Sequence, residues 1–230
     1  RLPPRGGRGQ PGFFDDAAAD AYRGALGNIL MSQEFYETDP GRDFVRGYTY
    51  QMNRSTGPGR TAIGFMIPPV PGGHGHHAEF AQRFGKWSLL CVISEDLPEE
   101  RNRVELDPVL RDSSGIPAPK VTYRLSANTR KLLDHGIRNG AKVLEAAGAH
   151  RTSSNPVFRG GGWHLMGTAR MGNDSARSVV DSNCQAHQVH NPVLIDHSVF
   201  VTSGRVHPTP TPTPHRHAPP GQLAPHTTTR

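Results

Sequence analysis

The chain has 230 residues, of which 34% are hydrophobic, and its formal net charge is +6. This length accommodates one large domain or parts of two. Without a run of 18 apolar residues we expect no membrane-spanning helix, and the two cysteines, Cys91 and Cys184, are too few for a disulfide framework. Terminal arginines supply much of the positive charge, which indicates solvated ends rather than one basic binding face.

The first half of the chain alternates helical and strand patterns. Residues 15–31 begin with two aspartates and continue with Ala, Leu and Ile, which predicts a helix. Alternation over 44–53 and the apolar, partly β-branched run 61–67 predict strands. A Pro/Gly-rich break then leads into a short helix ending near Phe84, and the apolar run 86–96 predicts a buried strand around a buried cysteine.

The second half contains a predicted strand pair and the longest predicted helix. Residues 102–107 and 120–125 alternate with period two around an insert rich in turn residues, so we expect them to pair as antiparallel strands. Residues 126–149 carry apolar side chains at helical spacing. On this helix Gly136 and Gly140 mark a side that approaches another backbone closely.

Two short strands, predicted at 178–182 and 192–196, complete the pattern. Strands, then a helix, and then short strands again are typical of an α/β chain with α+β character. We find no internal repeat.

Residues 162–209 concentrate side chains suited to chemistry. His164 follows a tryptophan and precedes small residues, so its imidazole can face an open site with a dry wall. His207 precedes a proline, which favours an extended backbone, and Asp196 ends a predicted strand, where α/β sheets place ligand contacts. Because histidine titrates near neutral pH, the two imidazoles are either a base and a hydrogen-bond partner for one substrate hydroxyl or ordinary structural histidines.

The same segment resembles the C-terminal signature of the glucose-methanol-choline (GMC) family of FAD-dependent oxidoreductases. The matching stretches are, in chain order, GWHLMGTARMGND, SVVDSNCQAH, NPVLIDHSVFVTSG and HPT. Residues 94–136 also resemble that family's substrate-binding region, so the resemblance covers residues 41–209. Each stretch is weak by itself, whereas the ordered set at this spacing is specific.

The resemblance implies a fold and a reaction. The fold is an antiparallel substrate-domain sheet with helices, joined to the C-terminal strands of an FAD-binding domain. The reaction is oxidation of an alcohol or sugar at a CH–OH group, with hydride passing to flavin N5 and then to an electron acceptor. His164 matches the base that removes the hydroxyl proton, and His207 matches the residue that hydrogen-bonds the same oxygen.

Five further positions match the family's cofactor-binding residues. Asp196 and His197 correspond to a dipeptide that approaches the FAD pyrophosphate and ribitol. Val206, Pro208 and Thr209 belong to a turn beside the flavin ring. At position 197 the family usually has Gly or Ala, so we expect the histidine side chain to obstruct the FAD phosphates.

Other departures from the family pattern concern the two ends of the chain. A dinucleotide-binding GxGxxG is absent, and prolines after Thr209 prevent the apolar helix that the family places there. The sequence also does not begin with Met. We therefore expect a fragment or a shifted reading frame that by itself binds FAD poorly or not at all.

These observations predict four segments. Residues 1–12 are expected to be a disordered linker, 13–158 the substrate-binding domain, 159–209 the signature that completes the FAD-binding domain, and 210–230 a disordered tail.

Three alternative interpretations remain open at the level of sequence. His74, His76 and His77 crowd one loop and His187 and His190 form H-x-x-H, but no Cys or carboxylate stands at a ligand spacing beside them, so we expect no metal site. The arginine-rich start and tail are too short, and too poor in aromatic residues, to indicate nucleic-acid binding. The third alternative is a catalytically inactive remnant, whose unpaired strand edges would favour aggregation.

Overall fold

A computed structural model describes residues 7–15, 29–64, 67–155, 164–189, 191–204 and 206. The described residues form two compact units: a sheet unit, residues 7–95 and 127–155, and a signature unit, residues 96–126 and 164–206. The predicted segment 13–158 is therefore divided, because residues 96–126 group with the C-terminal residues. Mixed antiparallel sheets and helices confirm the predicted α/β class with α+β character.

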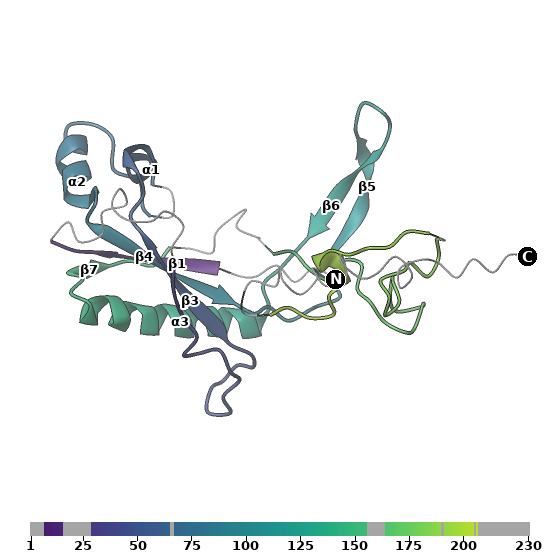
Figure 1. Cartoon of the computed structure of the whole chain (residues 1–230). Coiled ribbons are helices and arrows are strands. Elements are labelled where there is room, and N and C mark those ends of the chain that lie inside the picture. Colours follow the sequence, from purple (N-terminus) through teal and green to yellow (C-terminus); the bar gives the residue numbers. More distant parts are fainter. Residues whose placement is uncertain are drawn as a thin grey trace, which may run out of the picture. The chain divides into compact units, whose positions relative to one another are not determined.

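The sheet unit is built on a five-stranded sheet with strand order β2-β3-β4-β1-β7 (Figure 1). All neighbouring strands are antiparallel. The strands are β1 (Gly7–Phe13), β2 (Leu30–Ser32), β3 (Tyr48–Arg54), β4 (Trp87–Ser94) and β7 (Arg151–Thr152). The central strand β4 carries the apolar run recognised in the sequence and is buried along nearly its whole length.

Strand β1 corrects the expectation of a disordered linker over 1–12, which is wrong for residues 7–12. Its sequence, GRGQPGF, has little intrinsic strand preference. It is nevertheless a central strand, paired with β4 from Gly7 opposite Ile93 to Phe13 opposite Trp87. Partners distant in sequence therefore decide the conformation of this segment.

The predicted helix over 15–31 is wrong at its end, because residues 30–32 form β2. Residues 16–28 lie outside the described residues. The predicted strand 61–67 is also wrong: residues 61–63 belong to helix α1 (Pro58–Ile63), which ends at Gly64 in the left-handed conformation. Proline at the first turn and glycine after the last residue favour the helix, and these signals outweigh the β-branched composition.

The remaining helices agree with the sequence prediction. Helix α2 (His76–Arg83) ends next to the expected Phe84. Helix α3 (Ala127–Ala146) contacts β1 and β4 of the sheet. Both of its predicted close-approach glycines, Gly136 and Gly140, are buried against β4.

Gly136 lets the helix approach the sheet. A Cβ atom placed there would lie 2.5 Å from Cγ1 of Val92, a contact that requires the helix, the strand or the Val92 side chain to shift. Although alanine favours a helix over glycine by about 0.5–1 kcal/mol, overpacking costs about 1–3 kcal/mol.

We therefore expect Gly136→Ala to lower the free energy of unfolding by about 1–2 kcal/mol, measured by urea denaturation. Gly140→Ala is the matched control, because its Cβ would come closest to the flexible end of Leu90, at 3.0 Å, and would lie at ordinary contact distance from Tyr50 and Gln10. In the double variant with Val92→Ala, the Gly136→Ala substitution should cost much less. If its cost is unchanged, the Val92 contact is not its cause.

A hydrophobic cluster lies on the sheet face that β4 turns away from α3. It contains Phe13, Ile67, Trp87, Leu89 and Cys91, with Ile93 packed against it. As predicted, Cys91 is a buried free thiol, and burial raises its pKa to about 11.

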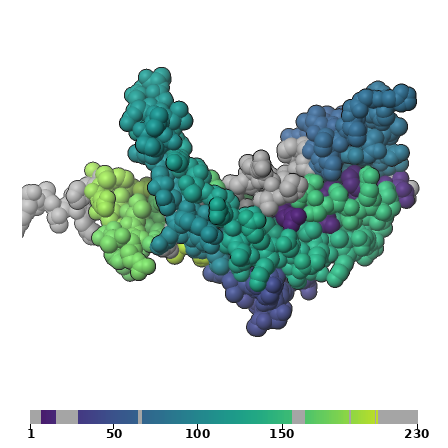
Figure 2. All heavy atoms as spheres, turned by 180° about the vertical axis from the view of Figure 1, so that it is seen from behind, coloured from purple at the N-terminus to yellow at the C-terminus, as the bar shows by residue number. Residues whose placement is uncertain are grey.

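In the signature unit, β5 (Arg103–Arg111) and β6 (Pro117–Thr122) form a two-stranded antiparallel hairpin. This pairing confirms the prediction from period-two alternation. Both strands extend into the insert that was expected to be a turn, and a register irregularity lies between Leu106 and Arg111. Figure 2 shows the hairpin as a narrow teal column.

The rest of the signature unit is mostly irregular. The short strands predicted at 178–182 and 192–196 are wrong, because only isolated bridges form there, including Val180 with Met171 and with Ala186. Backbone amides of residues 183 and 185 bond to the Asp181 carboxylate instead of to a neighbouring strand. A small cluster of Val180, Cys184 and Val199 is buried at its centre.

Candidate active site

His164 has an unusual backbone conformation. Its φ angle is +63°, in the left-handed region that few residues other than glycine adopt, and Gly167 follows at +77°. Such conformations cost about 1–3 kcal/mol and occur preferentially at functional sites. The His164 side chain is half-buried. The sequence indicated a turn of small residues here but not the position of the strain.

The two motifs singled out in the sequence lie side by side. Three backbone hydrogen bonds join them: from the amides of Gly167, Ala169 and Met171 to the carbonyls of His197, Ser198 and Val199, at 3.2, 2.9 and 2.8 Å. The turn that follows His164 is therefore fixed to the segment that carries Asp196. The structure thus brings His164 and Asp196–His197 into one local framework.

Asp196 begins a single 3₁₀ turn, η1 (His197–Val199). Its carboxylate Oδ1 accepts a hydrogen bond of 2.7 Å from the amide of Ser198, which fixes the side chain at the start of the turn. Asp196 is exposed, so this carboxylate can also contact a ligand.

His197 packs within its own unit. Its ring lies edge-on to Phe200, with the centroids 5.4 Å apart, and its Nε2 is buried without a hydrogen-bond partner among the described residues. A buried nitrogen without a partner costs free energy unless a bound group satisfies it. The residues at 196 and 197 are therefore compatible with a polar cofactor, and whether the His197 imidazole obstructs its phosphates stays a prediction.

A polar cavity of about 420 Å³ lies beside the same turn. Its lining includes Gly167, Thr168, Arg170, Arg177 and Glu100. Arg170 is held in place because its Nε donates a hydrogen bond of 2.7 Å to the carbonyl of Arg177. The lining is mostly polar, and its charged side chains are the positive Arg170 and Arg177 and the negative Glu100.

A hydrogen bond anchors the chain just before Val206. The hydroxyl of Ser203 donates to the backbone carbonyl of Asp96 at 2.8 Å, and the hydroxyl of Tyr123 donates to the Asp96 carboxylate at 2.6 Å. Asp96 is buried. Sequence reasoning missed this anchor, although an acidic residue directly after a buried strand was its visible signal.

Of the predicted site residues, His164, Asp196, His197 and Val206 are described. His207, Pro208 and Thr209 lie outside the described residues, so the pairing of His164 with His207 stays a prediction. The predicted tail 210–230 lies outside them as well.

Two of the histidines considered for metal binding, His76 and His187, have polar partners in the protein. Nε2 of His187 lies 3.0 Å from both the hydroxyl of Ser178 and the carbonyl of Gly172. Nδ1 of His76 lies 3.1 Å from the carbonyl of Pro71. Within the described ranges no group of three His, Cys, Asp or Glu side chains is arranged to hold a metal ion; His190 falls outside them.

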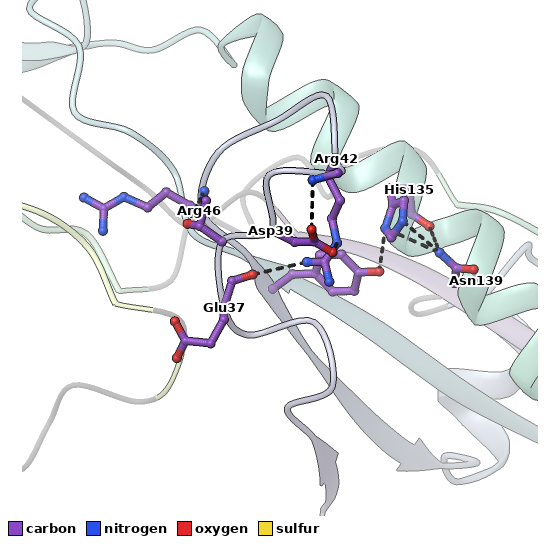
Figure 3. Close-up of polar contacts among 9 residues, drawn as sticks. Glu37, Asp39, Arg42, Arg46, His135 and Asn139 are labelled. Atoms are coloured by element: carbon purple, nitrogen blue, oxygen red, sulfur yellow. Dashed lines mark hydrogen bonds and ion pairs between the residues drawn. The ribbon is translucent and has the colours of Figure 1, made fainter.

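The sheet unit holds a second polar cluster, around His135 of α3. Nδ1 of His135 lies 2.9 Å from the hydroxyl of Tyr48. Figure 3 shows His135 and Asn139 on the helix facing the loop that carries Asp39 and Arg42. Burial lowers the pKa of His135, the Arg42 and Arg138 charges lower it further, and only Asp43 opposes them.

This shift predicts a pH dependence of stability. The pKa of His135 is lower in the folded chain than in the unfolded chain, so the unfolded chain binds the proton more tightly. The stabilisation is therefore complete above the unfolded value of about 6.5 and is lost as pH falls through the folded pKa.

We expect urea denaturation to show a lower free energy of unfolding at pH 5 than at pH 7.5. In His135→Gln the part of this difference that belongs to His135 should disappear, and in His74→Gln, on an exposed loop, it should persist. An unchanged pH dependence in His135→Gln would contradict the assignment.

Comparison with known proteins identifies the family to which this chain belongs. A family model described as GMC oxidoreductase matches residues 98–213, just over half of the chain. The chain is 41% identical over 194 residues to 2-methyl-1,2-propanediol dehydrogenase of Mycolicibacterium austroafricanum, covering 84% of this chain and 35% of that protein. It is 31% identical over 160 residues to 6'''-hydroxyparomomycin C oxidase of Streptomyces lividus, covering 66% of this chain and 29% of that protein.

A third relative is the fructose dehydrogenase large subunit of Gluconobacter japonicus, 32% identical over 117 residues, or 51% of this chain and 21% of that subunit. The chain thus spans about a third or less of the length of these relatives. No helix among the described residues is long and apolar enough to cross a membrane.

The described residues define an α/β chain. One unit contains an antiparallel sheet backed by a helix, and the other contains the signature segment with His164. The chain belongs to the GMC oxidoreductase family and represents a C-terminal portion of such a protein.

Proposed function

We propose that this chain is the C-terminal part of an FAD-dependent enzyme that oxidises an alcohol or sugar at a CH–OH group. The observation that carries the proposal is the backbone ladder that fixes the His164 turn to the Asp196 turn. The relatives support the substrate class, since their names specify 2-methyl-1,2-propanediol, 6'''-hydroxyparomomycin C and fructose. FAD, when bound, accepts the hydride.

His164 acts as the general base. Its imidazole takes the proton from the substrate hydroxyl, so that negative charge develops on the oxygen and the adjacent C–H bond weakens towards hydride loss. A positioned base contributes typically about 10²–10⁴-fold in rate. The left-handed backbone at His164 helps to aim the imidazole, and the half-buried position limits competition from water.

His207 donates a hydrogen bond to the same oxygen and holds the substrate hydroxyl next to the base. Ser203 supports this role, because its bond to the Asp96 carbonyl fixes the chain four residues earlier.

The cofactor is held in part by residues of this chain. As the family resemblance implies, Asp196 and His197 would hold its pyrophosphate and ribitol, and Val206, Pro208 and Thr209 would contact its ring. The exposed Asp196 carboxylate and the unsatisfied Nε2 of His197 support this assignment.

A chimera tests the proposal. In it, residues 41–209 of this chain replace the matching part of the 2-methyl-1,2-propanediol dehydrogenase. We expect the purified chimera to show flavin absorbance and to reduce an artificial electron acceptor when given a small diol. Bound flavin without alcohol-dependent reduction would instead support the inactive-remnant alternative.

A further inference from the structure

The polar cavity of the signature unit holds two guanidinium groups. Arg170 and Arg177 both line it, together with Gly167 and Thr168. All of its described lining residues belong to this one unit. None of them is assigned above to the base, the substrate hydroxyl or the cofactor, so the cavity is a separate feature of the unit.

The size and the lining of the cavity define what it can hold. Its volume of about 420 Å³ lies within the range of small-molecule sites, about 300–1,000 Å³. Besides the two arginines, the uncharged polar residues Thr168, Ser175 and Gln188 line it, and their side chains can donate and accept hydrogen bonds. The lining therefore suits a hydroxylated molecule rather than an apolar one.

The two arginines carry charge that no carboxylate of the described residues pairs with. Arg83 and Arg101 each reach a carboxylate oxygen at 2.6 Å. The ion pairs within the described ranges include neither Arg170 nor Arg177. Two guanidinium groups at one cavity repel each other, so an anion bound between them would relieve the repulsion.

Backbone contacts hold both arginines at the cavity. Arg170 is half-buried, and its Nε donates a hydrogen bond of 2.7 Å to the carbonyl of Arg177. The amide of Arg177 donates at 3.0 Å to the carbonyl of Asp174, whose carboxylate accepts from the Ala176 amide at 2.9 Å. The terminal nitrogens of Arg170 take no part in its bond to Arg177, so they can bind the oxygens of a carboxylate or a phosphate.

Glu100 limits the charge of the ligand. It lines the same cavity and is exposed. Its carboxylate would repel a ligand that is anionic throughout, but it accepts hydrogen bonds from hydroxyl groups. A hydroxylated molecule with a single anionic group meets both requirements.

We propose that the cavity is a binding site for a small polyol that carries one oxyanion group, a carboxylate or a phosphate. The oxyanion binds to Arg170 and Arg177, and the hydroxyl groups bind to the uncharged polar side chains and to Glu100. Because Gly167 lines the cavity and its amide bonds to η1, the ligand contacts the turn that follows His164. The proposal does not depend on the oxidation proposed above, since binding can be measured without flavin.

Titration of the isotopically labelled 230-residue chain, followed by NMR amide shifts, tests the proposal. The probes are glycerol 3-phosphate and glycerate at constant ionic strength, with glycerol and chloride as controls. We expect both anions to shift the amide signals of Gly167, Thr168 and Ser175 with dissociation constants on the order of 1 mM. Glycerol and chloride should leave these signals unchanged, and the tighter of the two anions identifies the preferred oxyanion.

Substitutions assign the binding to the arginines. Arg177→Gln should weaken both anions about fivefold or more, because it removes one charge but keeps the carbonyl that orients Arg170. Arg111→Gln is the matched control, since it makes the same change on the hairpin of the same unit, outside the cavity lining, and should leave binding unchanged. Arg177 is exposed, so its substitution should not affect folding.

Glu100→Gln tests the sign of the electrostatic effect. Removing this negative charge should strengthen the binding of inorganic phosphate about two- to fivefold.

Two results would overturn the proposal. One is equal weakening by Arg177→Gln and Arg111→Gln, which would show that the anions respond only to the net charge of the chain. The other is unchanged amide signals of Gly167, Thr168 and Ser175 at about 50 mM of either anion, well above the expected dissociation constant.

Discussion

Replacing His164 with asparagine in the chimera should lower kcat by about 10²–10⁴-fold, the usual contribution of a positioned base. Flavin absorbance should be unchanged, because the base is assigned to the substrate and not to the cofactor. Asparagine is the informative substitution because it tolerates the left-handed backbone that His164 adopts at φ +63°.

Alanine at the same position tests the backbone separately from the chemistry. His164→Ala should lose as much turnover as His164→Asn. It should also have a lower melting temperature than His164→Asn, because the left-handed conformation is less favourable for alanine than for asparagine. His74→Asn, on an exposed loop of the other unit, is the matched control and should leave kcat unchanged. If His164→Asn retains turnover within threefold, His164 is not the base.

Replacing Trp87 with alanine should lower the free energy of unfolding by about 3–5 kcal/mol, the usual cost of deleting a large buried side chain. Trp87 is fully buried at the start of β4, in the cluster with Phe13 and Leu89. The substitution would leave a cavity within this buried cluster.

Trp87→Phe separates the effect of lost side-chain volume on stability from the effect of the buried indole N–H group. The indole Nε1 has no hydrogen-bond partner among the described residues, so phenylalanine loses some packing but also removes an unsatisfied donor. We expect it to cost much less than alanine in urea denaturation followed by far-UV circular dichroism. Leu30→Ala, at an exposed position, should stay within about 0.5 kcal/mol of the wild type. A loss below about 1 kcal/mol for Trp87→Ala would show that this cluster is not the core.

Much of the architecture could be predicted from local patterns. Strand β4, helix α3 and the hairpin β5–β6 are long or strongly periodic, so burial and periodicity are visible in their residues alone. The two glycines of α3 also indicated the close helix–sheet contact before the fold was known.

The failures have a common cause. Strand β1 is rich in glycine, and helix α1 contains β-branched residues, so their composition points away from the structure that forms. Pairing with β4 makes residues 7–13 a strand. Proline at the first turn and glycine after the last residue, Pro58 and Gly64, favour the helix over residues 58–63. The strands expected near Val180 and Val193 were apolar but too short to pair, because carboxylate-capped turns use the backbone groups.

The candidate site divides in the same way. The ordered motifs carried the resemblance to the family, and that resemblance implied the roles of His164, His207 and Asp196 and the class of reaction proposed. Only the tertiary structure decided that the His164 turn is joined to η1 by backbone bonds and that His197 packs on Phe200. The physical reason is that a residue's type fixes which chemistry its side chain can perform, whereas its contacts, strain and burial depend on segments far apart in the chain.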